Sequence, residues 1–176
     1  MAEPQIKVII NPAAGAYSTR RKWPRISQWL KKVGLLFDQV FTEEMGHAIE
    51  LARTAVSDGY RRIVAVGGDG TVNEVVNGVF ASGSSEVAVG VISTGTGSDF
   101  IRSVGISRDY TTACSALTSP RRLSIDVGVV EYQRQGRPWS DISSMPPASA
   151  LMPLWSKKPS ACPSTSAALF PMWPGC

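Results

Sequence analysis

Histidine and cysteine are scarce in this chain, which has one histidine and three cysteines among its 176 residues. The cysteines, Cys114, Cys162 and Cys176, form no pair with the spacing of zinc ligands or of a redox motif. Their number and spacing therefore favour a reduced, cytoplasmic setting. No apolar run is long enough to span a bilayer, and the opening residues, Met1 to Pro4, lack the pattern of a signal peptide.

Charge of either sign is modest, with 18 Lys and Arg residues against 14 Asp and Glu residues and a formal net charge of +4. One basic cluster stands out, and it consists of Arg20, Arg21, Lys22, Arg25, Lys31 and Lys32. We interpret this cluster as the solvated face of a helix, in preference to a contact with an acidic membrane. Aromatic residues are not interleaved with it, so the sequence gives no support to nucleic-acid binding.

Two common phosphate-binding motifs are also missing, because the chain contains neither Gly-x-x-x-x-Gly-Lys-Ser/Thr nor Gly-x-Gly-x-x-Gly. It does contain Gly67-Gly68-Asp69-Gly70-Thr71 between an apolar segment, Ile63 to Val66, and a helical pattern, Val72 to Phe80. Three glycines at a strand-to-helix turn let bare N–H groups approach an anion, which the helix dipole also attracts. We therefore predict a phosphate-binding loop here, although glycine at such a turn also serves backbone conformation alone.

Three more apolar segments end in short polar loops and predict further strands. If all four strands are parallel, their loops meet at the carboxyl edge of one sheet, where open α/β folds bind their ligands. The segments and loops are Lys7 to Ile10 before Asn11-Pro12-Ala13-Ala14-Gly15, Phe37 to Phe41 before Thr42, and Val87 to Ile92 before Ser93 to Phe100.

The segments between these strands have the periodicity of helices, with apolar residues three and four positions apart. These residues are Trp23, Ile26, Trp29, Leu30 and Val33, then Ala48, Leu51, Ala52, Ala55 and Val56, then Val72, Val75, Val76, Val79 and Phe80. In the first segment, Pro24 falls where a first-turn proline is tolerated. Right-handed crossovers then predict an α/β fold, a Rossmann-like layered domain whose mainly parallel sheet is flanked by helices. Leu123 to Tyr132 alternates as a further strand does.

The last 38 residues, Trp139 to Cys176, differ in composition from the rest. They hold seven of the twelve prolines and three charged side chains, and no helix or strand period is sustained there. We predict an irregular tail over residues 134–176. A proline-rich ligand for a partner protein is an alternative, but no Pro-x-x-Pro repeat supports it. A third interpretation is that translation leaves an ancestral reading frame near Pro138.

Three motifs, in their order and spacing, carry a resemblance to a known family. They are Asn11 to Gly15, Gly67 to Glu74 and Gly95 to Phe100. Together they resemble the catalytic domain of the diacylglycerol and sphingosine lipid kinase family over about residues 5 to 132. The resemblance implies a kinase-like, ATP-binding domain in residues 1–133. Ser98 departs from the asparagine that is usual at its position in the family.

The resemblance also implies a site for ATP and Mg²⁺ at these loops. Thr42 would lie near the base, and Asp69 would act in acid/base chemistry, with Mg²⁺, a backbone donor or the ribose between its carboxylate and the ATP phosphates. The implied nucleotide-binding residues are Asn11, Gly15, Thr42, Gly67, Gly68, Asp69, Gly70, Thr71, Val72, Asn73, Glu74, Gly95, Thr96 and Gly97. For Asn73 and Glu74 the alternative is helix capping. The metal ligands stay unassigned.

The activity that the resemblance implies is transfer of the γ-phosphoryl group of ATP to a lipid hydroxyl, such as that of diacylglycerol, by a protein peripheral to the inner membrane surface. In bacterial members a second, β-rich domain carries lipid recognition, metal ligands and the base, and residues 139–176 are too few to form one. We therefore expect an ATP-binding half with little or no turnover. The alternatives are a kinase of a soluble acceptor such as NAD and a non-catalytic nucleotide-binding remnant.

Overall fold

The computed structural model describes residues 6–84, 86–134, 137–143 and 169–170. Its centre is a sheet with four parallel strands in the order β2-β1-β3-β4. Each strand begins and ends within one residue of its predicted segment, because polar loops bound each apolar run. The four strands are β1 (Ile6–Ile10), β2 (Phe37–Phe41), β3 (Arg62–Gly67) and β4 (Ala88–Ser93).

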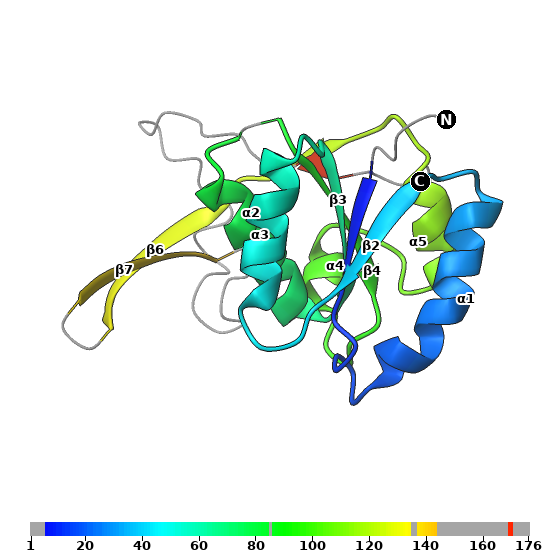
Figure 1. Cartoon of the computed structure of the whole chain (residues 1–176), viewed down its shortest axis with the longest axis horizontal. Helices are drawn as coiled ribbons and strands as arrows, with labels where there is room; N and C mark the ends of the chain where they lie inside the picture. The colour runs from blue at the N-terminus through cyan, green and yellow to red at the C-terminus, as the bar shows by residue number, and fades with distance from the viewer. Residues whose placement is uncertain (1–5, 85, 135–136, 144–168, 171–176) are drawn as a thin grey trace.

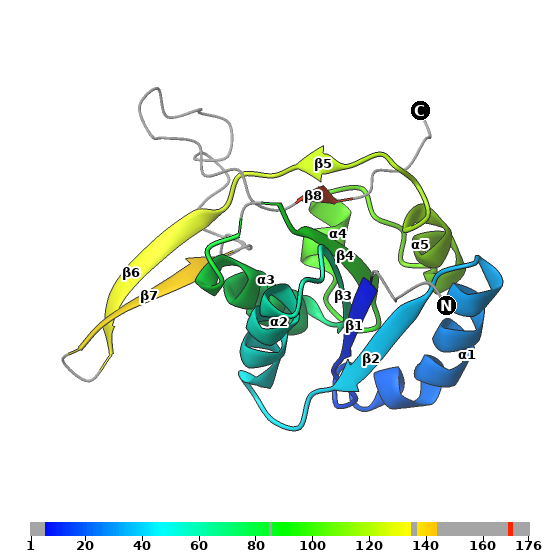
Figure 2. The same cartoon turned by 45° about the horizontal axis from the view of Figure 1, so that its top comes forward.

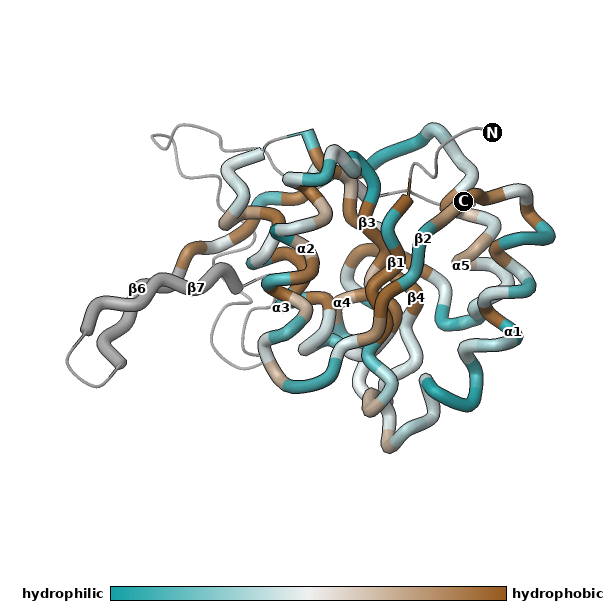
Figure 3. Tube along the Cα trace, in the orientation of Figure 1, coloured by the Kyte–Doolittle hydropathy of each residue, from teal (hydrophilic) through white to brown (hydrophobic). Residues whose placement is uncertain are grey.

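Helices cover both faces of this sheet, as the crossover pattern predicts (Figure 1). One face carries α2 (His47–Ser57), α3 (Asp69–Ala81) and α4 (Asp99–Ser103). The other face carries α1 (Ser18–Lys32) and α5 (Tyr110–Ala116). Figure 3 shows hydrophobic residues concentrated along the central strands, between the two helical layers. The result is the expected layered α/β domain with a mainly parallel sheet.

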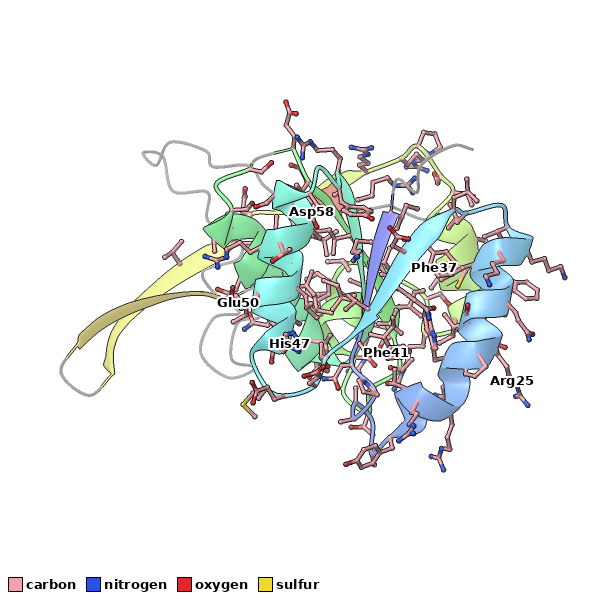
Figure 4. All side chains as sticks on the ribbon, in the orientation of Figure 1. Arg25, Phe37, Phe41, His47, Glu50 and Asp58 are labelled. Atoms are coloured by element: carbon pink, nitrogen blue, oxygen red, sulfur yellow. The ribbon has the colours of Figure 1, made fainter. Side chains whose placement is uncertain are left out.

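Helix α1 illustrates how the periodic pattern becomes packing. Its apolar stripe is buried, and the Trp23 ring meets the rings of Phe37 and Phe41 edge-on, with centroid distances of 6.3 and 6.2 Å. Figure 4 shows both phenylalanines on β2 beside this helix, while Arg25 points away from the sheet. All six residues of the basic cluster are exposed. None of the helices in the described residues is long and apolar enough to cross a membrane.

The position of Pro24 in α1 differs from the prediction. The helix begins at Ser18, so Pro24 lies inside it and not in its first turn. Pro24 is exposed, so the position without an N–H group lies on the outer side of the helix.

The prediction of one strand from Leu123 to Tyr132 is wrong. The structure divides this segment into β5 (Leu123–Ser124) and β6 (Gly128–Arg134). Strand β5 joins the main sheet through β8 (Leu169–Phe170), which pairs with β4, whereas β6 pairs with β7 (Arg137–Ser143) in a separate antiparallel sheet (Figure 2). Alternation of apolar residues specifies which face a side chain occupies, but it does not specify the partner strand.

Strand β7 lies in the segment that was expected to be irregular. That expectation is therefore wrong for residues 137–143, where seven residues form a ladder with β6. Of the remaining predicted tail, only β6's last residue, Arg134, and β8 fall within the described residues.

Candidate functional site

The loop after β1 is tied to the start of α3 through Asn11. The Asn11 backbone N–H donates to the carbonyl of Val66 at 2.9 Å, and its side-chain Nδ2 donates to Thr71 Oγ1 at 3.0 Å. The side-chain oxygen accepts from the N–H of Ala13 at 3.0 Å, which folds the loop back on itself. Asn11 therefore fixes the first loop against the second, and the Thr71 hydroxyl serves as the acceptor of this bond.

The Gly67-Gly68-Asp69-Gly70-Thr71 segment forms the turn from β3 into α3. A Cβ atom at Gly67 would overlap the Thr71 side chain, so glycine is required there. Helix α3 has no side-chain cap, and its first intrahelical bond runs from the Val72 N–H to the Gly68 carbonyl at 3.1 Å. The N–H groups of Asp69, Gly70 and Thr71 precede that bond, so the helix presents its usual unpaired donors at this end.

Gly70 differs from its neighbours because the space beside it is open. It is exposed, and no heavy atom lies within 4 Å of the position that a Cβ atom would take. Packing within the described protein therefore does not explain glycine at position 70. A ligand approaching the start of α3 would come closest to the backbone at this point.

The loop after β4 contacts the Gly67 to Thr71 turn through backbone atoms. The Thr94 N–H donates to the Gly67 carbonyl at 2.8 Å, and the Gly95 N–H reaches the same oxygen at 3.3 Å. A Cβ atom at Gly95 would lie 2.7 Å from the Gly68 Cα. The two loops therefore approach each other as closely as they do because position 95 is glycine.

Asp69 joins these two loops through its side chain. Its Oδ2 accepts the backbone N–H groups of Ser98 at 3.0 Å and Asp99 at 3.2 Å, which are the N-cap and first residue of α4. A Cβ atom at Gly97 would lie 2.9 Å from the same oxygen. Ser98 is held in the left-handed region at φ 77°, which asparagine tolerates better than serine. In this structure the Asp69 carboxylate has a clear positioning role.

Gly15 and two hydroxyl side chains that follow it complete the junction. Gly15 has φ +60°, and a Cβ atom there would lie 2.5 Å from the Thr94 carbonyl oxygen. Ser18 Oγ donates to that same oxygen at 2.9 Å, and the Thr19 and Thr94 hydroxyls are hydrogen-bonded to each other. Ser18, Thr19 and Thr94 are not among the predicted site residues, because their role depends on partners about 75 positions away in the chain.

Several other predicted site residues are buried in the protein or make hydrogen bonds within it. Glu74 Oε2 accepts the N–H of Ala48 at 3.2 Å, so it caps the neighbouring helix α2 and not its own. Val72 is buried in the core, and the Thr42 N–H bonds the Ile10 carbonyl at 2.8 Å. Asn73 is half-buried, and its carbonyl accepts a bond from the Asn77 side chain at 2.9 Å.

Two arginines bracket the outer side of the third loop. Arg108 donates to the carbonyl of the exposed Thr96 at 3.3 Å, and Arg102 donates to the Gly97 carbonyl at 3.4 Å while pairing with Asp99 at 3.0 Å. These contacts hold the loop from the solvent side. Arg108 also makes the local potential more favourable for a polyanion, whereas the charge of Arg102 is balanced by Asp99.

The resulting arrangement fits a nucleotide phosphate group. Backbone N–H donors at a helix start suit an anion, and the open space at Gly70 admits one. No group of three or more His, Cys, Asp or Glu residues is placed to hold a metal within the described residues. Mg²⁺ is often held by one or two carboxylates together with substrate phosphates, and Asp69 offers one carboxylate here.

Comparison with known proteins gives consistent matches over the same region. A family model described as the diacylglycerol kinase catalytic domain matches residues 5–130. Two curated relatives, both named diacylglycerol kinase and from Staphylococcus aureus strains bovine RF122 / ET3-1 and MRSA252, are each 34% identical over 122 residues, which is 69% of this chain and 38% of theirs. A solved diacylglycerol kinase structure from Bacillus anthracis str. Sterne has a TM-score of 0.63 and 25% identity, covering 77% of this chain and 45% of that one. The matched part of this chain thus covers 38% of the curated relatives' length and 45% of the solved structure's.

Proposed function

This chain belongs to the diacylglycerol kinase catalytic domain family, and we propose that it is the nucleotide-binding half of an ATP-dependent lipid kinase. The observation that carries the proposal is the junction of three loops at the carboxyl edge of the sheet, where Asn11, Asp69 and Thr94 fasten the start of α3 in place. Residues 1–133 form the proposed domain.

The proposed roles follow from the hydrogen-bond donors, the open space and the charge that these residues have available for a ligand. The unpaired N–H groups at the start of α3 bind the ATP phosphates, and the glycines at positions 68, 70 and 95 keep that surface free of side chains. Asp69 holds α4 through Oδ2 and directs its carboxylate charge at a Mg²⁺ ion that arrives with the nucleotide. Bound Mg²⁺ would neutralise charge on the phosphates and orient them for transfer.

The acceptor that we propose is a lipid hydroxyl such as that of diacylglycerol, reached by a protein that is cytoplasmic and peripheral to the membrane. The groups proposed above all serve the phosphate donor, and Asp69, the acid/base candidate among them, is engaged with the N–H groups of Ser98 and Asp99. We therefore expect these 176 residues to bind Mg-ATP and to transfer phosphate to lipid slowly or not at all.

The first test is thermal unfolding with and without Mg-ATP, for the wild-type chain and for Asp69→Asn. Ligand at 100 times its Kd stabilises the native state by about 2.7 kcal/mol, which corresponds to a Tm rise of about 5–10 °C for a chain of this size. Asparagine keeps an acceptor for the Ser98 and Asp99 N–H groups but removes the charge, so the Mg²⁺-dependent part of the rise should disappear. Asp58→Asn, at the end of α2, is a charge-matched control away from the site and should behave as wild type.

A second measurement separates the candidate activities. Labelled ATP is offered with diacylglycerol in mixed micelles, with NAD, or with no acceptor. Robust lipid phosphorylation would contradict the expected low turnover, and phosphorylation of NAD would replace the lipid with a soluble acceptor. A cooperatively unfolding protein whose Tm ignores Mg-ATP would refute nucleotide binding altogether.

A further inference from the structure

A second concave feature lies at the opposite end of the sheet from the three loops. It is a cavity of about 160 Å³ at the amino ends of β3 and β4, covered by Leu117 and residues 118–122. Strand β3 has six residues, so its two ends are separated by roughly 17–20 Å. The cavity is therefore distinct from the proposed nucleotide site.

Small side chains on β4 create this space. The sheet register places Arg62 beside Ala88 and Val64 beside Gly90, so these two cross-strand pairs share the face that α5 covers. Ala88 fills little volume there, and Gly90 leaves room for Leu117, whose Cδ2 lies 2.5 Å from the position that a Gly90 Cβ atom would take. The cavity thus has an apolar floor beneath the end of α5.

Three arginines line the open side of this cavity, namely Arg62, Arg121 and Arg122. Arg62 is held in place because its guanidinium donates to the Leu117 carbonyl at the end of α5. Arg121 and Arg122 are exposed, and the turn that carries them is closed by a bond from the Arg121 N–H to Ser119 Oγ at 3.2 Å. No acidic residue lines the cavity in the part of the chain that the structure describes.

These three arginines form no ion pair within the part of the chain that the structure describes. Within the described residues, ion pairs join Arg53 to Glu50 and Arg102 to Asp99, and neither pair involves the cavity. Burial, and then the charge of Arg122, hold the pKa of Arg62 below its ordinary value. Both effects disfavour the charged guanidinium, and a bound dianion would counteract the repulsion between the two arginines.

We propose that this cavity is a binding site for a phosphomonoester dianion. Guanidinium groups match phosphate oxygens in a two-pronged geometry, and several arginines without acidic partners suit a doubly charged group. The Ser119 hydroxyl accepts the Arg121 N–H and keeps its own proton to donate. The volume is close to that of an engineered cavity of about 150 Å³ that binds benzene, so it admits a phosphate with a small organic group.

Two sources can supply this chemistry, a soluble phosphate ester and the headgroup of a lipid phosphomonoester. The test measures binding of inorganic phosphate and of glycerol 3-phosphate by calorimetry and by thermal unfolding, without nucleotide and at a constant ionic strength set with chloride. In parallel, co-sedimentation is measured with phosphatidylcholine vesicles that do or do not contain phosphatidic acid. The probes are applied to the wild type, to the Arg121→Gln/Arg122→Gln double variant and to Arg25→Gln.

We expect a Tm rise of about 3–5 °C at a phosphate concentration ten times its Kd, and at least a tenfold loss of affinity in the double variant. Arg25→Gln, which removes an exposed charge on α1, should bind as wild type does. Arginine-dependent binding of a soluble ligand identifies the soluble source, and such binding to phosphatidic acid vesicles alone identifies the lipid source. Equal binding by the double variant, or no binding by the wild type to any probe, would overturn the proposal.

Discussion

Replacement of Gly70 by alanine separates folding from ligand binding more cleanly than any other change at the junction. A Cβ atom at this position meets no protein atom within 4 Å, and the residue is in the first turn of α3 with a helical backbone. Alanine at a compatible position stabilises a protein by about 0.4–1 kcal/mol, because it restricts the unfolded chain. We therefore expect the ligand-free Gly70→Ala protein to melt about 1–4 °C above wild type.

The same methyl group should weaken Mg-ATP binding if phosphate occupies the open space. A thirtyfold increase in Kd would reduce the stabilisation at 100 times the wild-type Kd from about 2.7 to about 0.9 kcal/mol. Thermal unfolding with a series of ATP concentrations measures both quantities in one protein. Gly95→Ala is the contrasting variant, since its Cβ atom would lie 2.7 Å from the Gly68 Cα and should lower stability before any ligand is added. Unchanged ATP affinity in Gly70→Ala would show that the nucleotide does not approach this backbone.

Two further predictions concern the fold. Gly78→Ala, on the same helix as Gly70, should destabilise the protein by about 1–3 kcal/mol in urea unfolding, because its Cβ atom would overlap the Ile49 carbonyl. A stabilised variant would mean that α2 and α3 are not packed as described. Burial first, and then the Asp109 charge, raise the pKa of the Cys114 thiol to about 12 from 9.0. The raised pKa stabilises the native state fully below about pH 9, and this stabilisation is lost as the pH rises toward 12. The difference in unfolding free energy between the wild type and Cys114→Ala should therefore decline over this pH range. A difference that does not change with pH would contradict the prediction.

The parallel sheet and its helices could be predicted because their signals are local. Short apolar runs such as Ile63 to Val66 and periodic stripes such as Val72 to Phe80 reflect burial on one or both faces, and burial is what the residue pattern records. Pro24 was misplaced because helix α1 begins at Ser18, where polar residues carry no apolar period. The segment from Leu123 was misjudged because the choice of partner strand depends on tertiary structure.

The site, like the fold, was predictable where it depends on neighbouring residues and not where it depends on residues far apart in the sequence. The glycine loops were identifiable, since a strand-to-helix turn with several glycines has few uses. The hydrogen-bond partners of individual side chains were not identifiable, because these partners lie far away in the sequence. Glu74 was weighed as a cap for its own helix, but it caps α2 through Ala48, and Asp69 reaches α4 across 29 residues of sequence.

The bonds from the Thr94 and Gly95 N–H groups to the Gly67 carbonyl have a consequence for the thermodynamics of binding. These hydrogen bonds join backbone to backbone, so the loops are already ordered before a ligand arrives. A ligand then loses its own freedom on binding but need not supply the entropy of closing a flexible loop. Affinity at this edge of the sheet is consequently governed by the contacts themselves and by displaced water, and the receptor contributes little conformational cost.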